Sequence, residues 1–175
     1  MPSIFTHAAV PLVLRALAGP RIFHGRMLGA GLALSIVPDA DVAAFALGIP
    51  YDAAAGHRGL THSVAFAAVV SVAAAFLVRG GVPLRVAVLC LFAVALSHGL
   101  LDMLTNGGLG VALAWPVLPD RWFLPWQPIE VSPIGAGFFS MRGLRVLGSE
   151  LLWVWLPAAA LVAAAAVARR RSRPQ

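Results

Sequence analysis

Long apolar stretches constrain this chain more than any other feature. Four of them approach the roughly 20 residues that a helix needs to cross a bilayer. They lie at about 27–48, 61–78, 84–104 and 150–168. A shorter apolar piece at about 4–18 is either a thin, tilted fifth span or a helix lying in the interface. We therefore predict an all-α fold, an integral membrane helical bundle with four to five transmembrane helices.

The composition agrees with a single membrane domain covering residues 1–175. Only 11% of the residues are charged and 60% are hydrophobic, whereas charged residues make up about 25% of an average protein. All thirteen basic residues are arginine and the net charge is +6, which could suggest nucleic acid. However, the arginines lie at the ends of apolar segments and in the tail at 169–173, where they suit topology and lipid headgroups better. We expect the lipid bilayer as a partner and no nucleic acid, and the sequence leaves the oligomeric state open.

Arginine placement also predicts an orientation. With the 79–85 turn and the C-terminal tail in the cytoplasm, nine of the thirteen arginines lie inside. The five tryptophans then lie on or near the outer face, as an aromatic belt would. The Gly- and Pro-rich segment 105–149 is expected to lie on the membrane surface and to cap a cavity.

Three short motifs hold three of the seven acidic residues and three of the five histidines. They are Pro38-Asp39-Ala40-Asp41, His57-Arg58-Gly59-Leu60-Thr61-His62-Ser63 and Ser97-His98-Gly99-Leu100-Leu101-Asp102. An ionisable group at bilayer depth is costly unless a partner or a cavity receives it, so such residues point to function. Counted at about 1.5 Å per residue, the motifs reach similar depths. We expect them to converge near the outer side of the membrane.

The spacing within the motifs predicts metal ligands. His98 and Asp102 are four residues apart and share one helix face; the alternative is a hydrogen-bonded pair that only joins helices. Asp39 and Asp41 would diverge on a regular helix, but Pro38 kinks it and lets both turn toward one cavity. Alternatively, one carboxylate is a ligand and the other orients a histidine, or both are exposed in a loop.

The histidine motif completes the predicted set. His57 and His62 lie near the start of a span and flank Arg58, whose guanidinium suits a phosphate or carboxylate. His7 is a further candidate, although an N-terminal histidine is more often structural. Mixed His and Asp donors suit Zn, Mn, Fe or Mg. The predicted metal ligands are His7, Asp39, Asp41, His57, His62, His98 and Asp102, for one or two divalent ions, with Zn or Mn expected.

These motifs resemble those of the YdjM-like family of small bacterial membrane-bound, metal-dependent hydrolases. The matching stretches are His7, Val-Pro-Asp-Ala-Asp at 37–41, Gly-His-Arg-Gly-Leu-Thr-His-Ser at 56–63, Leu-Ser-His-Gly-Leu-Leu-Asp-Met-Leu-Thr at 96–105 and Trp-Pro at 115–116. Family members often carry a histidine directly after the second aspartate, where this chain has Val42. The resemblance implies a multi-pass protein of the bacterial inner membrane, a metal and hydrolysis. A weaker similarity of the His-x-x-x-Asp type, to zinc-dependent phospholipase C and related nucleases, points to phosphoesters.

The leading hypothesis is a membrane-bound hydrolase of a phosphoester or other ester in a lipid-like substrate, using water that the metal activates. Asp41 would take the proton from that water. Arg58, helped by Arg121, would hold the anionic group, and Trp115 and Trp122 would bind the acyl or headgroup portion. Two alternatives remain: a divalent metal-ion transporter or metal-binding protein without hydrolytic activity, and an assembly factor whose polar core only holds helices together.

Overall fold

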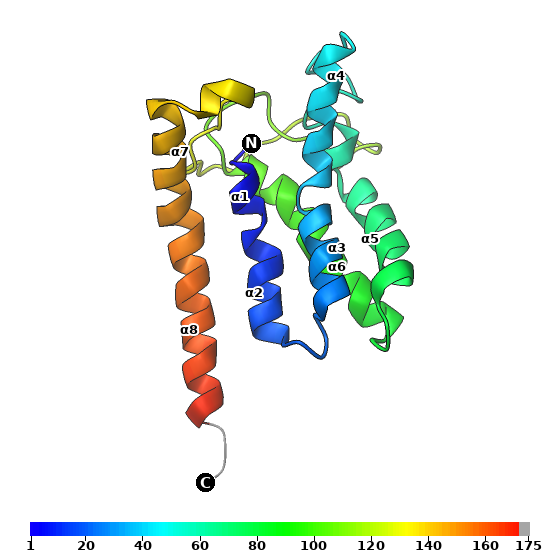
Figure 1. Cartoon of the computed structure of the whole chain (residues 1–175). Coiled ribbons are helices and arrows are strands. Elements are labelled where there is room, and N and C mark those ends of the chain that lie inside the picture. The colour runs from blue at the N-terminus through cyan, green and yellow to red at the C-terminus, as the bar shows by residue number, and fades with distance from the viewer. Residues whose placement is uncertain (172–175) are drawn as a thin grey trace.

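The computed structural model describes residues 1–171, and within that range the prediction of an all-α fold is confirmed (Figure 1). The α-helices are α1 (Ile4–His7), α2 (Ala9–Ala18), α3 (Gly25–Leu34), α4 (Ala43–Ala46), α5 (Val64–Val78), α6 (Leu84–Met103), α7 (Met141–Glu150) and α8 (Leu156–Arg171). Short 3₁₀ turns η1 (Val37–Val42), η2 (Leu60–His62) and η3 (Gly135–Phe138) and the π-helical turn η4 (Leu151–Trp155) connect or extend them. Part of the arginine tail, including Arg173, lies outside the described residues.

Three continuous helical stretches are long and apolar enough to cross a membrane. They are Gly25–Ala46, Leu84–Met103 and Met141–Arg171, and the shorter apolar helices are Ile4–Ala18 and Val64–Val78. The last stretch begins inside the segment 105–149, which the sequence predicted to lie wholly on the surface. Helix α7 is amphipathic and buries Gly143, Val146 and Glu150. Because α7 contains polar residues, the pattern of apolar stretches did not show that this helix continues into α8.

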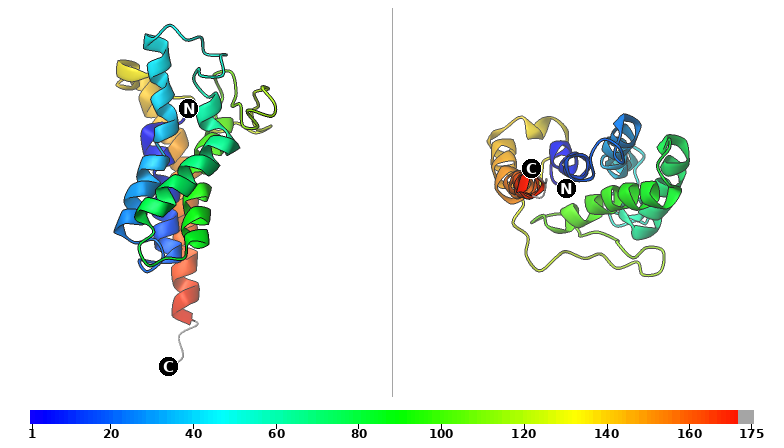
Figure 2. Two further views of the ribbon diagram at one scale, coloured as in Figure 1. Left: turned by 90° about the vertical axis from the view of Figure 1, so that its right-hand side faces the viewer. Right: turned by 90° about the horizontal axis from the view of Figure 1, so that it is seen from below.

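The bundle packs around α6. Helices α5 and α6 form a close antiparallel pair, in which the small buried residues Ala67, Ala75 and Ala87 allow the backbones to approach. Helices α2 and α3 cover the other side, and α8 stands at the edge beside α2 (Figure 2). No residue of α8 is buried, and an apolar helix that is largely exposed suits contact with lipid.

The first long stretch changes from α-helix to a 3₁₀ turn at the point where its aspartates lie. Helix α3 ends at Leu34, and Pro38 opens the tighter turn η1 that carries Asp39 and Asp41. Proline removes a backbone donor and clashes with the preceding turn, so a regular α-helix cannot continue through it. The break sits at the same end of the molecule as the N-terminus, η2 and the end of α6 (Figure 1).

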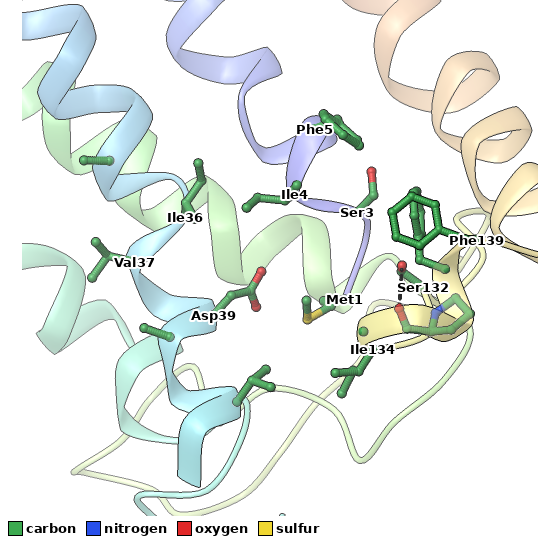
Figure 3. Close-up of a pocket in the computed structure, with 16 residues that line it drawn as sticks. Met1, Ser3, Ile4, Phe5, Ile36, Val37, Asp39, Ser132, Ile134 and Phe139 are labelled. Atoms are coloured by element: carbon green, nitrogen blue, oxygen red, sulfur yellow. Dashed lines mark hydrogen bonds between the residues drawn. The ribbon is translucent and has the colours of Figure 1, made fainter. Parts of the chain in front are cut away.

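The segment between α6 and α7 covers this end of the bundle. It contains no strand, only isolated bridges that pair Thr105 with Ile129 and Val111 with Trp122. A pocket of about 710 Å³ opens between η1, the start of the chain and η3, with Asp39 on its wall (Figure 3). The polar motifs are therefore enclosed by loops and helix ends rather than by the middle of the bundle.

Candidate metal centre

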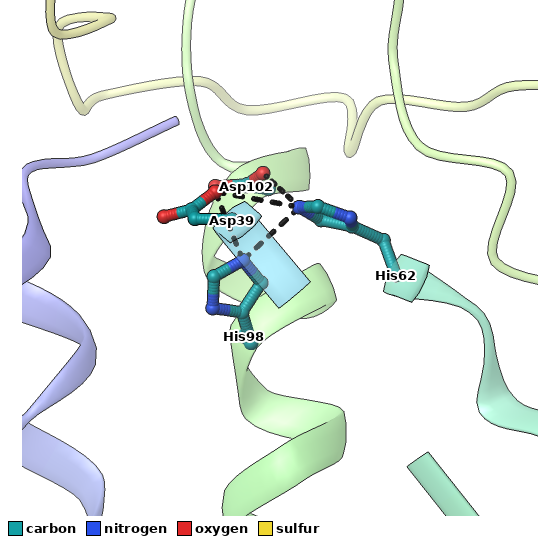
Figure 4. Close-up of side chains that lie close together, drawn as sticks. All are labelled: Asp39, His62, His98 and Asp102. Carbon is teal, nitrogen blue, oxygen red and sulfur yellow. Dashed lines mark hydrogen bonds and ion pairs between the residues drawn. The ribbon is translucent and has the colours of Figure 1, made fainter. Parts of the chain in front are cut away.

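The structure brings the three sequence motifs together at one point. Asp39 comes from η1, His62 from η2, and His98 and Asp102 from the last turns of α6 (Figure 4). One donor atom from each of these residues lies within 4.8 Å of all the others. The side chains of His62, His98 and Asp102 are fully buried, and that of Asp39 is 8% exposed. The four residues are called the metal cluster below.

The spacing of the donor atoms matches a coordination shell. Two donors that each lie about 2.0–2.1 Å from a zinc ion in tetrahedral geometry are about 3.3 Å apart. In the metal cluster, Nε2 of His62 lies 3.3 Å from Oδ2 of Asp102 and 3.6 Å from Oδ1 of Asp39. Nε2 of His98 lies 3.4 Å from the same Asp39 oxygen and 3.0 Å from Nε2 of His62. These separations fit the edges of a tetrahedron around one ion.

The tautomers of both histidines can be assigned from their outer partners. Nδ1 of His98 lies 2.8 Å from the carbonyl oxygen of Ser35, which can only accept, so Nδ1 carries the proton. Nδ1 of His62 lies 3.0 Å from the Thr61 hydroxyl and 3.2 Å from Asp41, and that hydroxyl already donates to Asp41. In their neutral forms both rings therefore turn bare Nε2 lone pairs toward each other and toward two carboxylates. That arrangement suits a cation between them.

The charge of the site also favours a cation. The carboxylates of Asp39, Asp41 and Asp102 lie close together, and the guanidinium of Arg58 is paired with Asp102. The carboxylate oxygens of Asp39 and Asp102 are buried and accept no hydrogen bond. Buried carboxylates are costly unless they are paired or coordinate a metal. The residues present therefore fit a divalent ion.

Asp41 lies behind the metal cluster and contacts Nδ1 of both His57 and His62. Oδ1 lies 2.6 Å from Nδ1 of His57, and Oδ2 accepts hydrogen bonds from the Arg58 backbone N–H at 3.1 Å and the Thr61 hydroxyl at 2.6 Å. Carboxylates that hold the outer nitrogen of a metal-binding histidine fix its tautomer and raise its basicity. Asp41, His57 and His62 also form a second group whose donors are close enough to hold an ion.

His7 packs against the opposite side of the metal cluster. Its ring is fully buried and stacks on that of His98, with centroids 3.8 Å apart. Nε2 of His7 lies 3.7 Å from Oδ1 of Asp102 and 3.8 Å from Oδ2 of Asp39. Neither ring nitrogen has a hydrogen-bond partner. The two aspartates thus direct one oxygen toward His62 and the other toward His7.

Arg58 is fully buried beneath the metal cluster. Its Nε lies 3.0 Å from Oδ2 of Asp102, and its other nitrogens donate to the Gly107 carbonyl at 2.8 Å and the Thr105 hydroxyl at 2.9 Å. Its backbone is left-handed, with φ of 61°. The guanidinium is thus engaged with the protein and pairs with Asp102, and its expected role of holding a substrate anion stays a prediction.

A glycine allows the histidine turn to reach α6. A Cβ atom on Gly99 would lie 2.8 Å from the carbonyl oxygen of His62, closer than real Cβ contacts. The absent side chain therefore lets η2 lie directly against the helix that carries His98. That approach places the two Nε2 atoms in the same metal cluster.

The chain matches known proteins along most of its length. The family model described as YdjM inner membrane protein matches residues 1–172. The chain belongs to the YdjM family. It is 43% identical over 160 residues to the inner membrane protein YbcI of Escherichia coli (strain K12). The aligned residues make up 90% of this chain and 92% of that relative. No solved structure matches. The resemblance seen in the sequence is thus confirmed, and this YdjM-family chain is an inner-membrane protein.

The remaining predicted site residues lie outside the metal cluster. Arg121 donates to the His57 carbonyl at 2.9 Å and to two carbonyls of the preceding loop, Tyr51 and Ala53, so it fastens the loop that carries His57. Burial lowers the pKa of this guanidinium. Trp122 pairs through its backbone with Val111 and is 36% exposed, and Trp115 is half-buried. The structure does not bring these three side chains into contact with the metal cluster, so their expected substrate roles stay predictions.

Several residues that support this YdjM-family site escaped the sequence reasoning. Thr61 and Thr105 lie within the matched stretches, and their hydroxyls hold Asp41 and Arg58. Glu150 is buried and accepts hydrogen bonds from the backbone N–H and hydroxyl of Ser3. A hydroxyl directly before His62 was an available signal for Thr61; nothing local marks the pairing of Ser3 with Glu150.

Proposed function

We propose that this protein is a membrane-bound, metal-dependent hydrolase of a phosphoester or other ester in a lipid-like substrate. The observation that carries the proposal is the convergence of the Nε2 atoms of His62 and His98 with the buried carboxylates of Asp39 and Asp102 in the metal cluster. Mixed His and Asp donors favour Zn or Mn. A bound divalent ion would supply Lewis acidity and an activated water, the chemistry used in ester hydrolysis.

The chain's own residues have distinct proposed roles. His62, His98, Asp39 and Asp102 bind the ion. Asp41 orients His57 and His62 through their Nδ1 atoms, and the same carboxylate remains the candidate to accept a proton, as the sequence suggested. Arg58 balances the charge of Asp102 and holds it in place.

A second ion is supported on the His7 side. Asp39 and Asp102 direct their remaining oxygens toward the unpartnered Nε2 of His7. Carboxylates shared in this way are typical of two-metal sites, in which the ions lie about 3.5–4 Å apart and stabilise both attacking and leaving oxygens. In this proposal a His7→Ala variant binds one ion fewer per chain than the parent, measured by elemental analysis.

Transport of a divalent ion is the less favoured alternative. A transit site needs polar access from both faces. Below His98, the successive inward positions of α6 are Val94, Leu91 and Ala87, all buried in the apolar core. That packing argues against a polar path, and metal flux into proteoliposomes would distinguish the two functions.

The decisive experiment uses the full chain purified in detergent, stripped with a chelator and reloaded with Zn or Mn. We expect about one or two ions per chain and hydrolysis of a member of a phospholipid panel. His98→Gln should remove both binding and activity. His24→Gln is the matched control, because His24 contacts the Arg79 carbonyl far from the metal cluster. Metal content and activity that are equal in these two variants would overturn the proposal.

A further inference from the structure

The pocket beside the metal cluster suggests which part of a substrate enters the protein. Its volume of about 710 Å³ lies within the roughly 300–1,000 Å³ of known ligand pockets. Three separate segments line it: the start of the chain with α1, the end of α3 with η1, and the loop around η3 (Figure 3). Among the side chains that line it, only that of Asp39 is charged; the other polar side chains are those of Ser3 and Ser132.

Asp39 connects this pocket to the metal cluster. Its carboxylate lies 3.4 Å from Nε2 of His98 on one side and lines the pocket on the other. It is also the only member of the metal cluster with an exposed side-chain fraction, 8% against 0% for His62, His98 and Asp102. A molecule that reaches the metal cluster from outside would therefore pass through the pocket.

The walls of the pocket are suited to hydrocarbon. Ile4, Phe5, Val37, Ile134 and Phe139 are between 41% and 88% exposed around it. None of the lining side chains is basic, so the walls offer an anionic headgroup no cationic side chain. In an inner-membrane protein such an apolar rim suits acyl chains, because burying each CH₂ group favours binding.

We propose that this pocket binds the hydrocarbon chain of a lipid substrate, with the ester or phosphoester group placed against Asp39. The inference rests on the proposed hydrolase function for the placement of the scissile group. The binding of the chain itself stands on the pocket alone. A single-chain lipid, such as a lysophospholipid, is the matching probe.

Photo-crosslinking tests chain binding without any reaction. The probe is a 16-carbon lysophospholipid with a diazirine near the end of its chain, added to the full-length protein in detergent. We expect crosslinks to residues 1–5, 33–42 and 132–139 that unlabelled lysophospholipid competes away. Crosslinks to the exposed helix α8 should resist that competition and give the background.

A variant with a side chain that fills the pocket can be compared with a control that carries the same substitution elsewhere. Ile134→Trp places a large ring in the pocket from a loop position that is already 49% exposed, whereas Val117→Trp adds the same ring at an 83% exposed position outside the lining. We expect Ile134→Trp to reduce the competed crosslinking at least about tenfold. Val117→Trp should leave it unchanged, and both variants should keep the metal content of the parent.

The outcomes separate this inference from the proposed function. Competed crosslinks without hydrolysis of any lipid would support the binding of the chain and count against the hydrolase. Hydrolysis whose kcat/KM is the same for 4-carbon and 16-carbon chains, with no competed crosslinks, would overturn the pocket assignment and leave the hydrolase standing. A dimer that Ile134→Trp dissociates would show that a second copy covers the pocket, which also overturns the assignment.

Discussion

At the scale of single residues, the site depends on hydrogen bonds made behind the metal cluster. His98 is held by a backbone carbonyl at Ser35, while His57 and His62 share the carboxylate of Asp41. Such outer partners decide which ring nitrogen keeps its lone pair. The orienting role of Asp41 was one of three alternatives that the Pro-Asp-Ala-Asp motif left open, and the contacts of its carboxylate favour it.

Replacing Asp41 tests that orienting role. Asp41→Asn keeps the volume but offers an amide in place of the carboxylate that accepts from His57, Thr61 and the Arg58 backbone. Loss of such an outer partner typically costs about 10–100-fold in metal affinity. Competition titration with a chromophoric chelator would measure the change. Asp52→Asn, in the exposed loop nearby, is the control, and equal affinities in the two variants would contradict the role.

Arg58 gives a prediction about stability rather than affinity. Its removal leaves Asp102 buried and without its cation, and breaking a buried pair in this way costs about 3–5 kcal/mol. We expect Arg58→Met to lower the unfolding temperature strongly in metal-free protein and less in metal-loaded protein, because the ion then neutralises Asp102. Thermal unfolding with and without metal tests this. Arg142→Met, at an exposed position of α7, should change neither curve.

At the scale of elements, the break between α3 and η1 and the end of α6 position the donors, while α7 fastens the start of the chain. The broken span was predictable, because proline next to two aspartates cannot continue a buried helix. The beginning of α7 was not, since its burial depends on partners that are distant in the sequence. Glu150 at its end lies against Ser3, 147 residues away.

The pairing of Glu150 with Ser3 should stabilise the position of His7. Hydrogen bonds to charged groups contribute about 1.5–3 kcal/mol, so Glu150→Ala should lower the unfolding temperature. It should also weaken metal binding modestly, because α1 carries His7 four residues beyond Ser3. Parallel thermal and metal titrations would measure both effects. Glu130→Ala in the surface segment serves as the reference. If Glu150→Ala had the same unfolding temperature and metal affinity as Glu130→Ala, the pairing of Glu150 with Ser3 would have no role in holding His7.

At the scale of the whole molecule, the sequence predicted the helical membrane bundle and the meeting of three motifs at one end. Periodicity and composition suffice for the first, because a bilayer demands long apolar helices. The second followed from equal depths along antiparallel spans. The detailed charge balance did not follow, because the burial of Arg58 against Asp102 depends on the path of the loop after α6, which carries Thr105 and Gly107.

The predicted orientation can be tested independently of any ligand. We expect the C-terminal tail in the cytoplasm and the loops around the metal cluster on the outer side. In a Cys90→Ser background, a cysteine introduced at Val117 should react with a membrane-impermeant maleimide in intact spheroplasts. A cysteine at Gly81, in the exposed turn between α5 and α6, should react only after lysis. The reverse pattern would place the metal cluster on the cytoplasmic side.

The contact at Gly99 leaves the histidine turn little room for change. A single added methyl group would force the histidine turn away from the helix, although it alters no charge and removes no donor atom. Gly99→Ala should therefore give a protein that is still helical and inserted in the membrane but binds the metal ion more weakly. The position of the histidine turn thus depends on a residue whose side chain is one hydrogen atom.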